Sequence, residues 1–298
     1  MAGIATANWE HRGQADHNMH TFAVVPSASG IGKSRFGFEV GQLMGSLRLG
    51  EGGAGGTGAG GPLGVVTWYC VFVDFNNGQR FDEAFDRRSN DDMRMGVRLA
   101  AQGLLRRDFL KLVRNSPSQY AAFTVSAVLV HIVTDALMTA DKNTTVALVL
   151  HLDEIQAYVD AFETKAAGRT ALKGMLRRVG DFMRHNYRGT TLHRRFFVVP
   201  VLTGTAAKDV RFLATDKYKE QSVLLHPLSE QSATAIFLAQ FPDHHDVLRQ
   251  DLFRIALADT GCVPRHVQFL LELPPGMDGS RLPMTTTTMK PRKRLQRR

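Results

Sequence analysis

The stretch from residue 22 to residue 36 restricts the fold of this chain more than any other segment. It reads F-A-V-V-P-S-A-S-G-I-G-K-S-R-F. The four apolar residues at its start predict a buried strand, the Pro/Ser/Gly segment predicts a turn, and Gly32-Lys33-Ser34 opens a helix. Strand, loop and helix in this order are typical of a phosphate-binding loop, which holds the phosphates of a nucleoside triphosphate.

The residue types of this loop suit a phosphate ligand. Gly30 and Gly32 can adopt backbone angles closed to other residues and leave room for phosphate, so that successive N–H groups point at the anion. Lys33 is expected to reach the β- and γ-phosphates, and Ser34 to place its hydroxyl on Mg²⁺. The usual pattern G-x-x-x-x-G-K-[ST] has glycine where this chain has Ser27, so a chance Gly/Ser loop before a helix is the alternative. The predicted binding residues for ATP or GTP in this loop are Ser29, Gly30, Ile31, Gly32, Lys33, Ser34 and Arg35.

A second motif closes the apolar run V-A-L-V-L-H-L-D-E at residues 146 to 154. This composition predicts a strand at the centre of a parallel sheet that is covered on both faces. Asp153 at its carboxyl end is expected to hold Mg²⁺, directly or through water, and Glu154 to polarise the attacking water as general base. The alternative is that Asp153 only caps a helix that starts near Ile155.

A third apolar strand, residues 196 to 202, ends in Thr203-Gly204-Thr205. Some phosphate-loop ATPases have a strand inserted between the loop strand and the Asp-Glu strand, and that strand ends in a polar residue beside the γ-phosphate. Thr203 or Thr205 is therefore expected to sense the phosphate or position the water. Alternatively, these threonines satisfy a turn around Gly204.

The region from residue 229 to residue 273 reads as helical and contains the segment G-C-V-P-R at residues 261 to 265. Many nucleotide switches carry a small helical lid with a basic residue that touches the nucleotide. Arg265, after a proline and at a helix start, is expected to reach the γ-phosphate. In the alternative, Gly261 and Pro264 merely end one helix and begin another.

The predicted fold is a three-layer α/β fold of the P-loop NTPase type, with a mainly parallel five-stranded sheet and a small C-terminal helical lid. The two remaining strands are expected over residues 65 to 75 and 222 to 225. Residues 1–20 are interpreted as a polar lead-in, residues 21–227 as the NTPase core, residues 228–275 as the lid and residues 276–298 as a disordered basic tail. Within the core, residues 50–64 form a glycine-rich loop and residues 80–140 a helical insert.

The net charge of +9 comes mostly from the tail. Residues 290 to 298, K-P-R-K-R-L-Q-R-R, contain six basic and no acidic residues. They are similar to a nuclear-import segment or a phosphate-binding arm, which predicts nucleic acid or a nuclear protein as a partner. The nucleus is thus favoured over the cytoplasm, with a solvated terminus as the bland alternative.

Other sequence features bear on membrane, metal and subunit partners. No uninterrupted apolar segment of membrane-spanning length is present, so no membrane partner is expected; residues 121 to 138 come nearest, but polar residues interrupt them. The two cysteines and the scattered histidines give no metal-ligand spacing, and no zinc site is predicted. A basic helix over residues 162 to 187 could supply an arginine to a neighbouring subunit, which leaves a homo-oligomer open.

Taken in order, S-G-I-G-K-S-R-F, V-F-V-D-F-N-N-G, H-L-D-E-I-Q, V-P-V-L-T-G-T and G-C-V-P-R-H-V-Q-F-L resemble a known module. It is the P-loop ATPase module of Crinkler effectors and kinetoplastid retrotransposon hot spot proteins, and the resemblance covers residues 20 to 273. It implies an AAA-like or signal-transduction ATPase core with nuclear action. Lys33 and Ser34 would then contact phosphate and Mg²⁺, and Asp153 and Glu154 would serve as the metal and water-activating pair.

The sequence therefore predicts an ATP-binding, Mg²⁺-dependent NTPase that switches conformation on hydrolysis. Lys33, Glu154, Thr203 and Thr205 are the expected catalytic residues, Ser34 and Asp153 the metal ligands, and Arg265 a further nucleotide contact. The alternative function is a nuclear interaction module that does not hydrolyse nucleotide and binds nucleic acid or a chromatin protein through its basic tail.

Overall fold

A computed structural model describes residues 1–26, 32–33, 36, 39–40, 66–115, 120–142, 144–185, 195–204, 218–242, 248, 250–264 and 266–267. The chain divides into two compact units, Met1–His226 and Pro227–Arg298. The sequence had placed the start of the helical lid at residue 228. Each unit is described by itself below.

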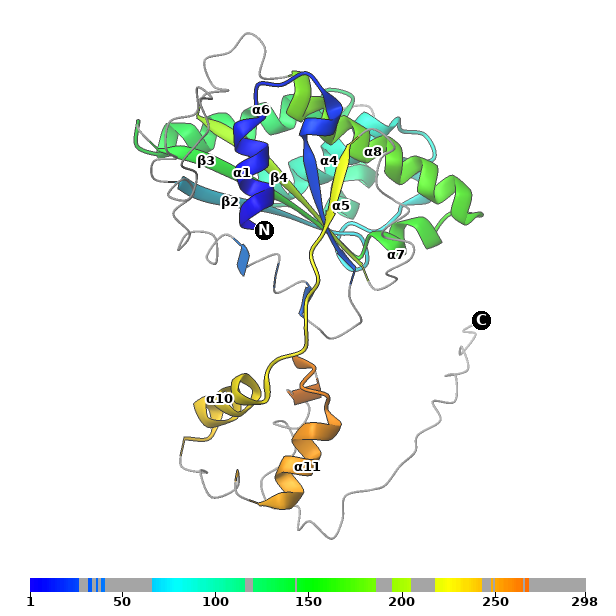
Figure 1. The fold of residues 1–298 in the computed structure, drawn as a ribbon. Helices are drawn as coiled ribbons and strands as arrows, with labels where there is room; N and C mark the ends of the chain where they lie inside the picture. The colour runs from blue at the N-terminus through cyan, green and yellow to red at the C-terminus, as the bar shows by residue number, and fades with distance from the viewer. Residues whose placement is uncertain are drawn as a thin grey trace, which may run out of the picture. The chain divides into compact units, whose positions relative to one another are not determined.

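The first unit is built on a parallel sheet (Figure 1). Its strands are β1 (Thr21–Pro26), β2 (Val66–Asp74), β3 (Thr145–Asp153), β4 (Phe196–Gly204) and β5 (Lys219–Ser222). They lie in the order β2-β3-β4-β1-β5, and every neighbouring pair is parallel. The predicted five-stranded sheet is confirmed. The predicted position of the last strand is wrong, because pairing with β1 places β5 at residues 219 to 222, three residues earlier than expected.

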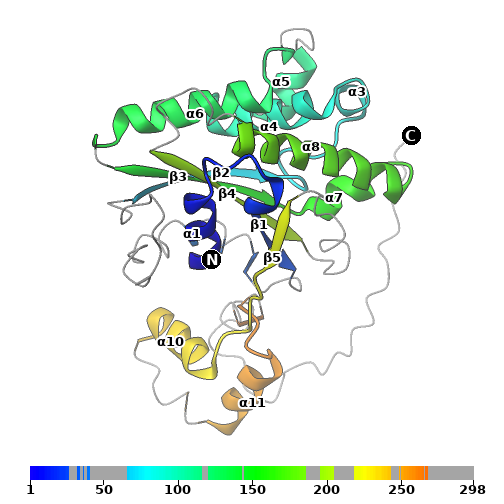
Figure 2. The ribbon, with the colours of Figure 1, turned by 45° about the horizontal axis from the view of Figure 1, so that its top comes forward.

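Two apolar cores cover the two faces of this sheet. Successive side chains of a strand point to opposite faces, and β1 shows this alternation: Phe22 and Val24 enter one core, while Ala23 and Val25 enter the other. Figure 2 shows α4 (Asp91–Gly103), α6 (Val125–Thr139) and α8 (Lys165–His185) on one face and α1 (Ala2–Glu10) on the other. The architecture is thus three-layered, as the uniformly apolar strands predicted.

Residues 1–20 are not a polar lead-in, and that prediction is corrected. Ala2–Glu10 forms helix α1, which buries Ile4, Ala5 and Trp9 in the second core. Asn8 connects the helix to strands β1 and β4 by hydrogen bonds. Its side-chain amide donates to the carbonyls of Thr21 (2.9 Å) and Val198 (3.0 Å), and its Oδ1 accepts from the Thr21 N–H (2.8 Å). A short 3-10 turn, η1 (His17–Met19), follows and leads into β1.

The helical insert predicted for residues 80–140 forms much of the first covering layer. It contains α3 (Glu83–Asp86), α4, α5 (Phe109–Asn115) and α6, and after β3 the layer continues with α7 (Ile155–Asp160) and α8. Helix α6 takes up most of the apolar stretch 121 to 138 and buries Val128, Leu129 and Val133 in the first core. In the part of the chain that the structure describes, no helix has both the length and the apolar character needed to cross a membrane.

A fully buried ion pair joins several of these helices. Arg98 of α4 donates to both carboxylate oxygens of Asp86 at 2.9 and 2.8 Å, and both side chains have no solvent exposure. Tyr158 of α7 donates to the same carboxylate at 3.0 Å. The Arg98 guanidinium also donates to the carbonyl of Gln79, in the turn that follows β2. One charge pair therefore connects α3, α4, α7 and the end of β2.

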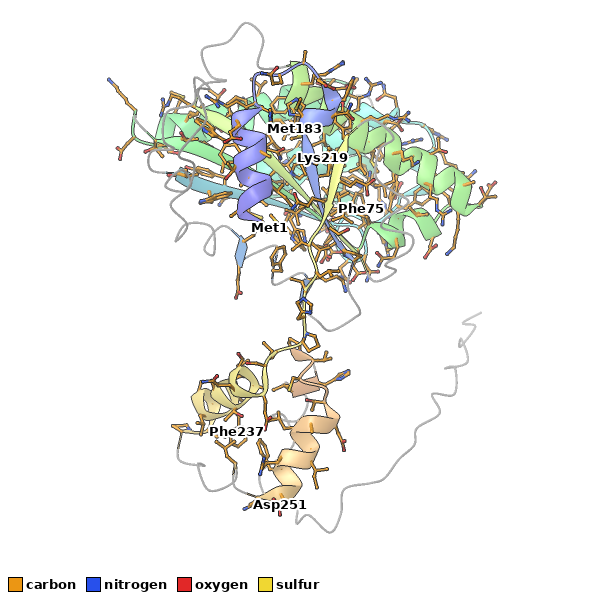
Figure 3. All side chains as sticks on the ribbon, viewed as in Figure 1. Met1, Phe75, Met183, Lys219, Phe237 and Asp251 are labelled. Carbon is orange, nitrogen blue, oxygen red and sulfur yellow. The ribbon has the colours of Figure 1, made fainter. Side chains whose placement is uncertain are left out.

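The second unit has a small core of its own. Its helices are α10 (Glu230–Gln240) and α11 (Asp251–Asp259), and the hydroxyl of Ser229 caps α10 by accepting from the Ser232 N–H. Phe237, labelled in Figure 3, packs on Phe253 with ring centroids 4.5 Å apart. The buried residues of this core are Ala233, Phe237, Leu257 and Val267.

Replacing Arg98 by methionine should destabilise the chain by about 3–5 kcal/mol, because it leaves the buried Asp86 carboxylate without its counter-charge. Urea unfolding followed by tryptophan fluorescence measures this change. The matched control is Arg87→Met, since Arg87 pairs with Glu163 at the surface, where these side chains are 49% and 74% exposed. The control should change stability by less than about 1 kcal/mol; equally small effects for both variants would contradict the stated role of the buried pair.

Candidate functional site

The carboxyl ends of the strands bring the predicted site residues to one edge of the sheet. In the parallel register, Thr203 of β4 lies beside Val25 of β1, and Asp153 of β3 lies beside Asp74 of β2. Leu152 pairs with Leu202, so the ends of β3 and β4 are level as well. The crevice beyond the carboxyl ends of the strands is where open parallel sheets bind ligands.

Gly32 and Lys33 lie where β1 gives way to a helical segment. Gly32 has φ +95°, a left-handed conformation that favours glycine over other residues, so the glycine is required here. The Phe36 N–H donates to the Gly32 carbonyl at 2.8 Å, which is a helical hydrogen bond that starts at the predicted position. Lys33 is 5% exposed, and its positive charge opposes the rise in the pKa of Glu154 that burial causes. The fold thus brings the lysine of the loop within electrostatic reach of the Asp-Glu motif.

Asp153 ends β3 and is buried, with 2% of its surface exposed. Its Oδ1 accepts from the Glu154 N–H at 2.9 Å and from the Thr203 hydroxyl at 2.5 Å. Helix α7 begins at Ile155 without a side-chain cap. The capping alternative therefore does not account for the position of Asp153.

Thr203 links two strands through its hydroxyl group. It is fully buried within β4, so the turn alternative does not describe it. A carboxylate oxygen only accepts, so the single hydroxyl proton of Thr203 goes to Asp153. The hydroxyl oxygen then accepts from Nε2 of His151 at 2.9 Å, which assigns the ring proton of His151 to Nε2. In this arrangement Thr203 positions the Asp153 carboxylate.

His151 is part of this site, although nothing but its position in an apolar strand, two residues before Asp153, marks it in the sequence. Burial lowers the pKa of His151 to about 4, against the opposite effect of the carboxylates of Asp153 and Asp74. The ring is therefore neutral at pH 7 and serves as a fixed hydrogen-bond donor. The two hydrogen bonds that connect His151 to Thr203 and Thr203 to Asp153 hold the Asp153 carboxylate in one orientation.

Glu154 has a strained backbone and a perturbed carboxyl group. Its φ is +53°, an uncommon conformation for a residue with a side chain, and such strain is concentrated at functional sites. Burial is the largest cause that raises the pKa of Glu154, and the charge of Asp153 acts in the same direction. The amide of Gln156 donates to its Oε2. A glutamate with a raised pKa next to a lysine and an aspartate has the properties of a general base.

The structure describes only part of the predicted site. Gly32, Lys33, Asp153, Glu154 and Thr203 are described and lie at or next to the carboxyl edge of the sheet. Seven other predicted residues lie outside the described ones: Ser29, Gly30, Ile31, Ser34, Arg35, Thr205 and Arg265. Their roles stay predictions.

The donor set of the described residues fits magnesium bound together with a nucleotide. Within the described ranges, no group of three or more His, Cys, Asp or Glu side chains is placed to hold a metal ion. Mg²⁺ in nucleotide sites needs only one or two protein oxygens, because phosphates and waters complete its octahedron. The carboxylate of Asp153, which Thr203 orients, could supply such an oxygen.

Comparisons with known proteins give little guidance. No family model matches the chain, and no curated protein matches it. Among solved structures, the chain is similar to the Aeropyrum pernix Orc1 protein in complex with DNA, with a TM-score of 0.41 and 12% sequence identity. That match covers 91% of this chain and 56% of the Orc1 chain, so this chain spans just over half of the other protein's length.

The class of fold follows from the architecture itself. Strand β4 lies between β1, which precedes the predicted phosphate-binding loop, and β3, which ends in Asp153. A five-stranded parallel sheet with this inserted strand, covered by helices on both faces, is a three-layer P-loop NTPase-like fold. The fold class predicted from the sequence is confirmed.

The neutral state of His151 predicts how stability depends on pH. Its pKa is lower in the folded chain than the value of 6.5 expected when unfolded, so between pH 6.5 and about 4 the unfolded chain binds a proton that the folded chain does not. This contribution to the free energy of unfolding is lost as pH falls through that window, up to roughly 3 kcal/mol. His151→Gln should therefore lose less stability than wild type between pH 7 and 4 in urea unfolding.

The control is His131→Gln, because His131 lies exposed on α6 beside Asp135. It should follow the wild-type pH profile. If wild type and His151→Gln lose stability equally as pH falls, the buried neutral histidine is contradicted.

Proposed function

We propose that this chain is an ATP-binding, Mg²⁺-dependent NTPase that acts as a conformational switch. The observation that carries the proposal is the position of Asp153, Glu154 and Thr203 at one edge of the sheet, joined by hydrogen bonds, with the buried Lys33 following β1 in the sequence. A cation for phosphate, an oxygen ligand for Mg²⁺ and a base for water are the parts that phosphoryl transfer to water requires.

Each described residue has a separate task in this proposal. Lys33 neutralises charge on the β- and γ-phosphates. Asp153 would hold Mg²⁺ directly or through water, and the bound ion would neutralise the charge that develops on the phosphates. Thr203 and His151 keep the Asp153 carboxylate in place, so little reorganisation is needed when nucleotide binds.

Glu154 is the proposed general base. Its raised pKa brings it closer to the working pH, where a carboxylate accepts a proton from water more effectively. Turnover should accordingly fall as the solution is acidified through the pKa of Glu154, because only the ionised form accepts the proton. The left-handed backbone at this residue fixes its carboxyl group relative to the end of β3.

The cellular setting of this activity is proposed from the sequence alone. The basic tail at residues 290 to 298 favours the nucleus and a nucleic acid or nuclear protein partner, and the resemblance to Crinkler and retrotransposon hot spot modules favours an effector context. The basic helix α8 gives less support to the idea that it supplies an arginine to a neighbouring subunit. Arg178 and Arg184 both lie near Asp181 of the same helix, at 3.9 and 3.8 Å, so their charges are paired within the helix.

Lys33→Ala should abolish measurable binding of ATP, because it removes the cation that the phosphates need. Binding of a fluorescent ATP analogue with Mg²⁺, followed by anisotropy, checks this. Lys142→Ala is a control with the same change of charge at an exposed lysine beyond α6, and it should bind as wild type does. Undiminished binding by Lys33→Ala would contradict the phosphate-binding role.

Glu154→Gln should leave nucleotide binding intact and lower the turnover number by about 10²–10⁴-fold, since the amide keeps the shape of the side chain but cannot accept the proton. Steady-state phosphate release and analogue binding, measured on the same preparation, separate the two effects. Glu163→Gln replaces an exposed glutamate and serves as the matched control. Equal hydrolysis rates for wild type and Glu154→Gln would overturn the catalytic assignment.

A further inference from the structure

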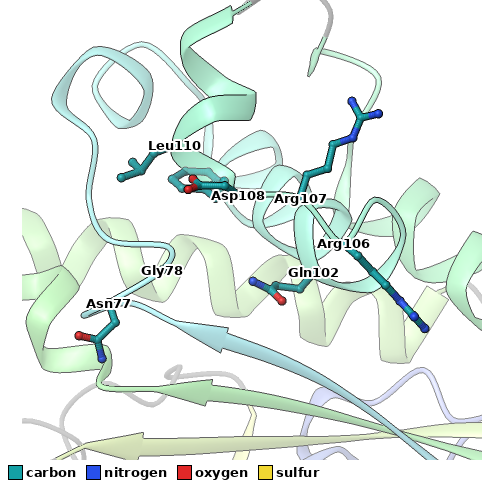
Figure 4. A pocket seen from close by; sticks show the side chains of 8 residues that line it. Asn77, Gly78, Gln102, Arg106, Arg107, Asp108 and Leu110 are labelled. Carbon is teal, nitrogen blue, oxygen red and sulfur yellow. The ribbon is translucent and has the colours of Figure 1, made fainter.

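A cavity lies in the first unit, beyond the carboxyl end of β2. Its volume is about 600 Å³, and Figure 4 shows it between the turn after β2 and the segment that joins α4 to α5. It is lined by Asn77, Gly78, Gln102, Arg106, Arg107, Asp108, Phe109 and Leu110. None of these residues has a role in the NTPase site proposed above.

Two of the residues that line this cavity are arginines. Within the described part of the chain, Arg106 and Arg107 form no ion pair and are exposed. Other arginines of the same region do pair: Arg94 with Asp91 at 2.8 Å and Arg114 with Asp82 at 3.6 Å. The one carboxylate that lines the cavity, Asp108, accepts from the Lys111 N–H at 3.2 Å. The two arginines outweigh the single carboxylate of Asp108, so the lining of the cavity carries a net positive charge.

Arg106 occupies a backbone position that favours glycine. Its φ is +48°, in the left-handed region. The Arg107 N–H donates to the Ala101 carbonyl at 2.9 Å, six residues back, so the segment after α4 folds back on the helix end. Glycine adopts a left-handed conformation without steric cost, so an arginine at this position costs stability. Strain of this kind is a reason to look for a function.

The directions of the two arginine side chains indicate whether the cavity suits a single small anion or an extended polyanion. In Figure 4 the guanidinium groups of Arg106 and Arg107 point away from each other, while Gln102 reaches into the space between them and Asn77. Divergent cations suit successive charges on an extended polyanion better than one phosphate held between them. Further exposed basic residues without ion pairs among the described residues are Arg80, Arg88 and Lys111.

We propose that Arg106 and Arg107 form a binding site for the backbone phosphates of a nucleic acid. The arginines contact two phosphates along one strand, and the amides of Gln102 and Asn77 are placed to donate to phosphate or sugar oxygens. Contacts of this kind hold the strand without reading its sequence, and most of their affinity comes from the release of counterions. The site is separate from the basic tail, and it does not require nucleotide hydrolysis.

The test compares double variants of the full-length chain that lose the same charge. Binding of a fluorescently labelled 20-base-pair DNA duplex of mixed sequence is followed by anisotropy across a range of salt concentrations. Arg106→Ala/Arg107→Ala should bind more weakly than wild type, and the slope of log K against log salt should fall by about two, one for each lost phosphate contact. Arg87→Ala/Arg114→Ala removes two paired arginines and should keep the wild-type slope.

A single variant separates binding from folding. Arg106→Gly relieves the left-handed strain, so its melting temperature should equal or exceed that of wild type while its affinity for the duplex falls. The tail is intact in every variant, so its contribution is common to all. Equal losses in the two double variants, or unchanged affinity in Arg106→Ala/Arg107→Ala, would overturn the proposal. So would loss of ATP binding in that variant, because it would assign the arginines to the nucleotide.

Discussion

The parallel pairing of β4 between β1 and β3 is the constraint on which the site depends. Three segments that are far apart along the chain meet because of it: the loop after β1, the Asp-Glu pair after β3 and Thr203 near the end of β4. A parallel sheet places all carboxyl ends at one edge, so correct strand order is sufficient to gather them. A shift of β4 by one residue would turn Thr203 to the other face of the sheet and remove its hydrogen bond to Asp153.

Two buried polar networks then fix what the sheet has gathered. In the first, His151 and Thr203 orient the Asp153 carboxylate. In the second, Arg98 and Asp86 hold Tyr158 on helix α7, and this helix begins directly after Glu154. Burying such groups costs solvation free energy, which hydrogen bonds offset only when every partner is in place. Both networks therefore stabilise one geometry at the residues proposed to hold Mg²⁺ and to activate water.

The sequence predicted the parts of this fold that local pattern determines. The apolar runs of β1, β3 and β4 carry enough information to place these strands and the sheet edge at which they end. It placed β5 three residues too late, because the segment K-E-Q-S has no apolar residue and is a strand only through pairing with β1. Helix α1 was missed for a similar reason, since Asn8 finds its partners on strands 13 and 190 residues away.

Local sequence pattern likewise identified only part of the candidate site. Lys33, Asp153 and Glu154 belong to motifs that can be recognised in the sequence alone, whereas the role of His151 depends on a hydrogen bond to Thr203, 52 residues later. Arg98 looks like a solvated residue of an amphipathic helix until Asp86 and Tyr158 are placed around it. Long-range polar contacts leave no periodic signal, so reasoning from the sequence could not find them.

Hydrolysis itself is tested most directly by the release of inorganic phosphate from ATP by the purified full-length chain, with Mg²⁺ and with a chelator in parallel. We expect release that requires Mg²⁺ and that falls to background in Lys33→Ala. Release by wild type no greater than that of Lys33→Ala, under conditions in which wild type binds ATP, would contradict the proposal that this chain is an NTPase.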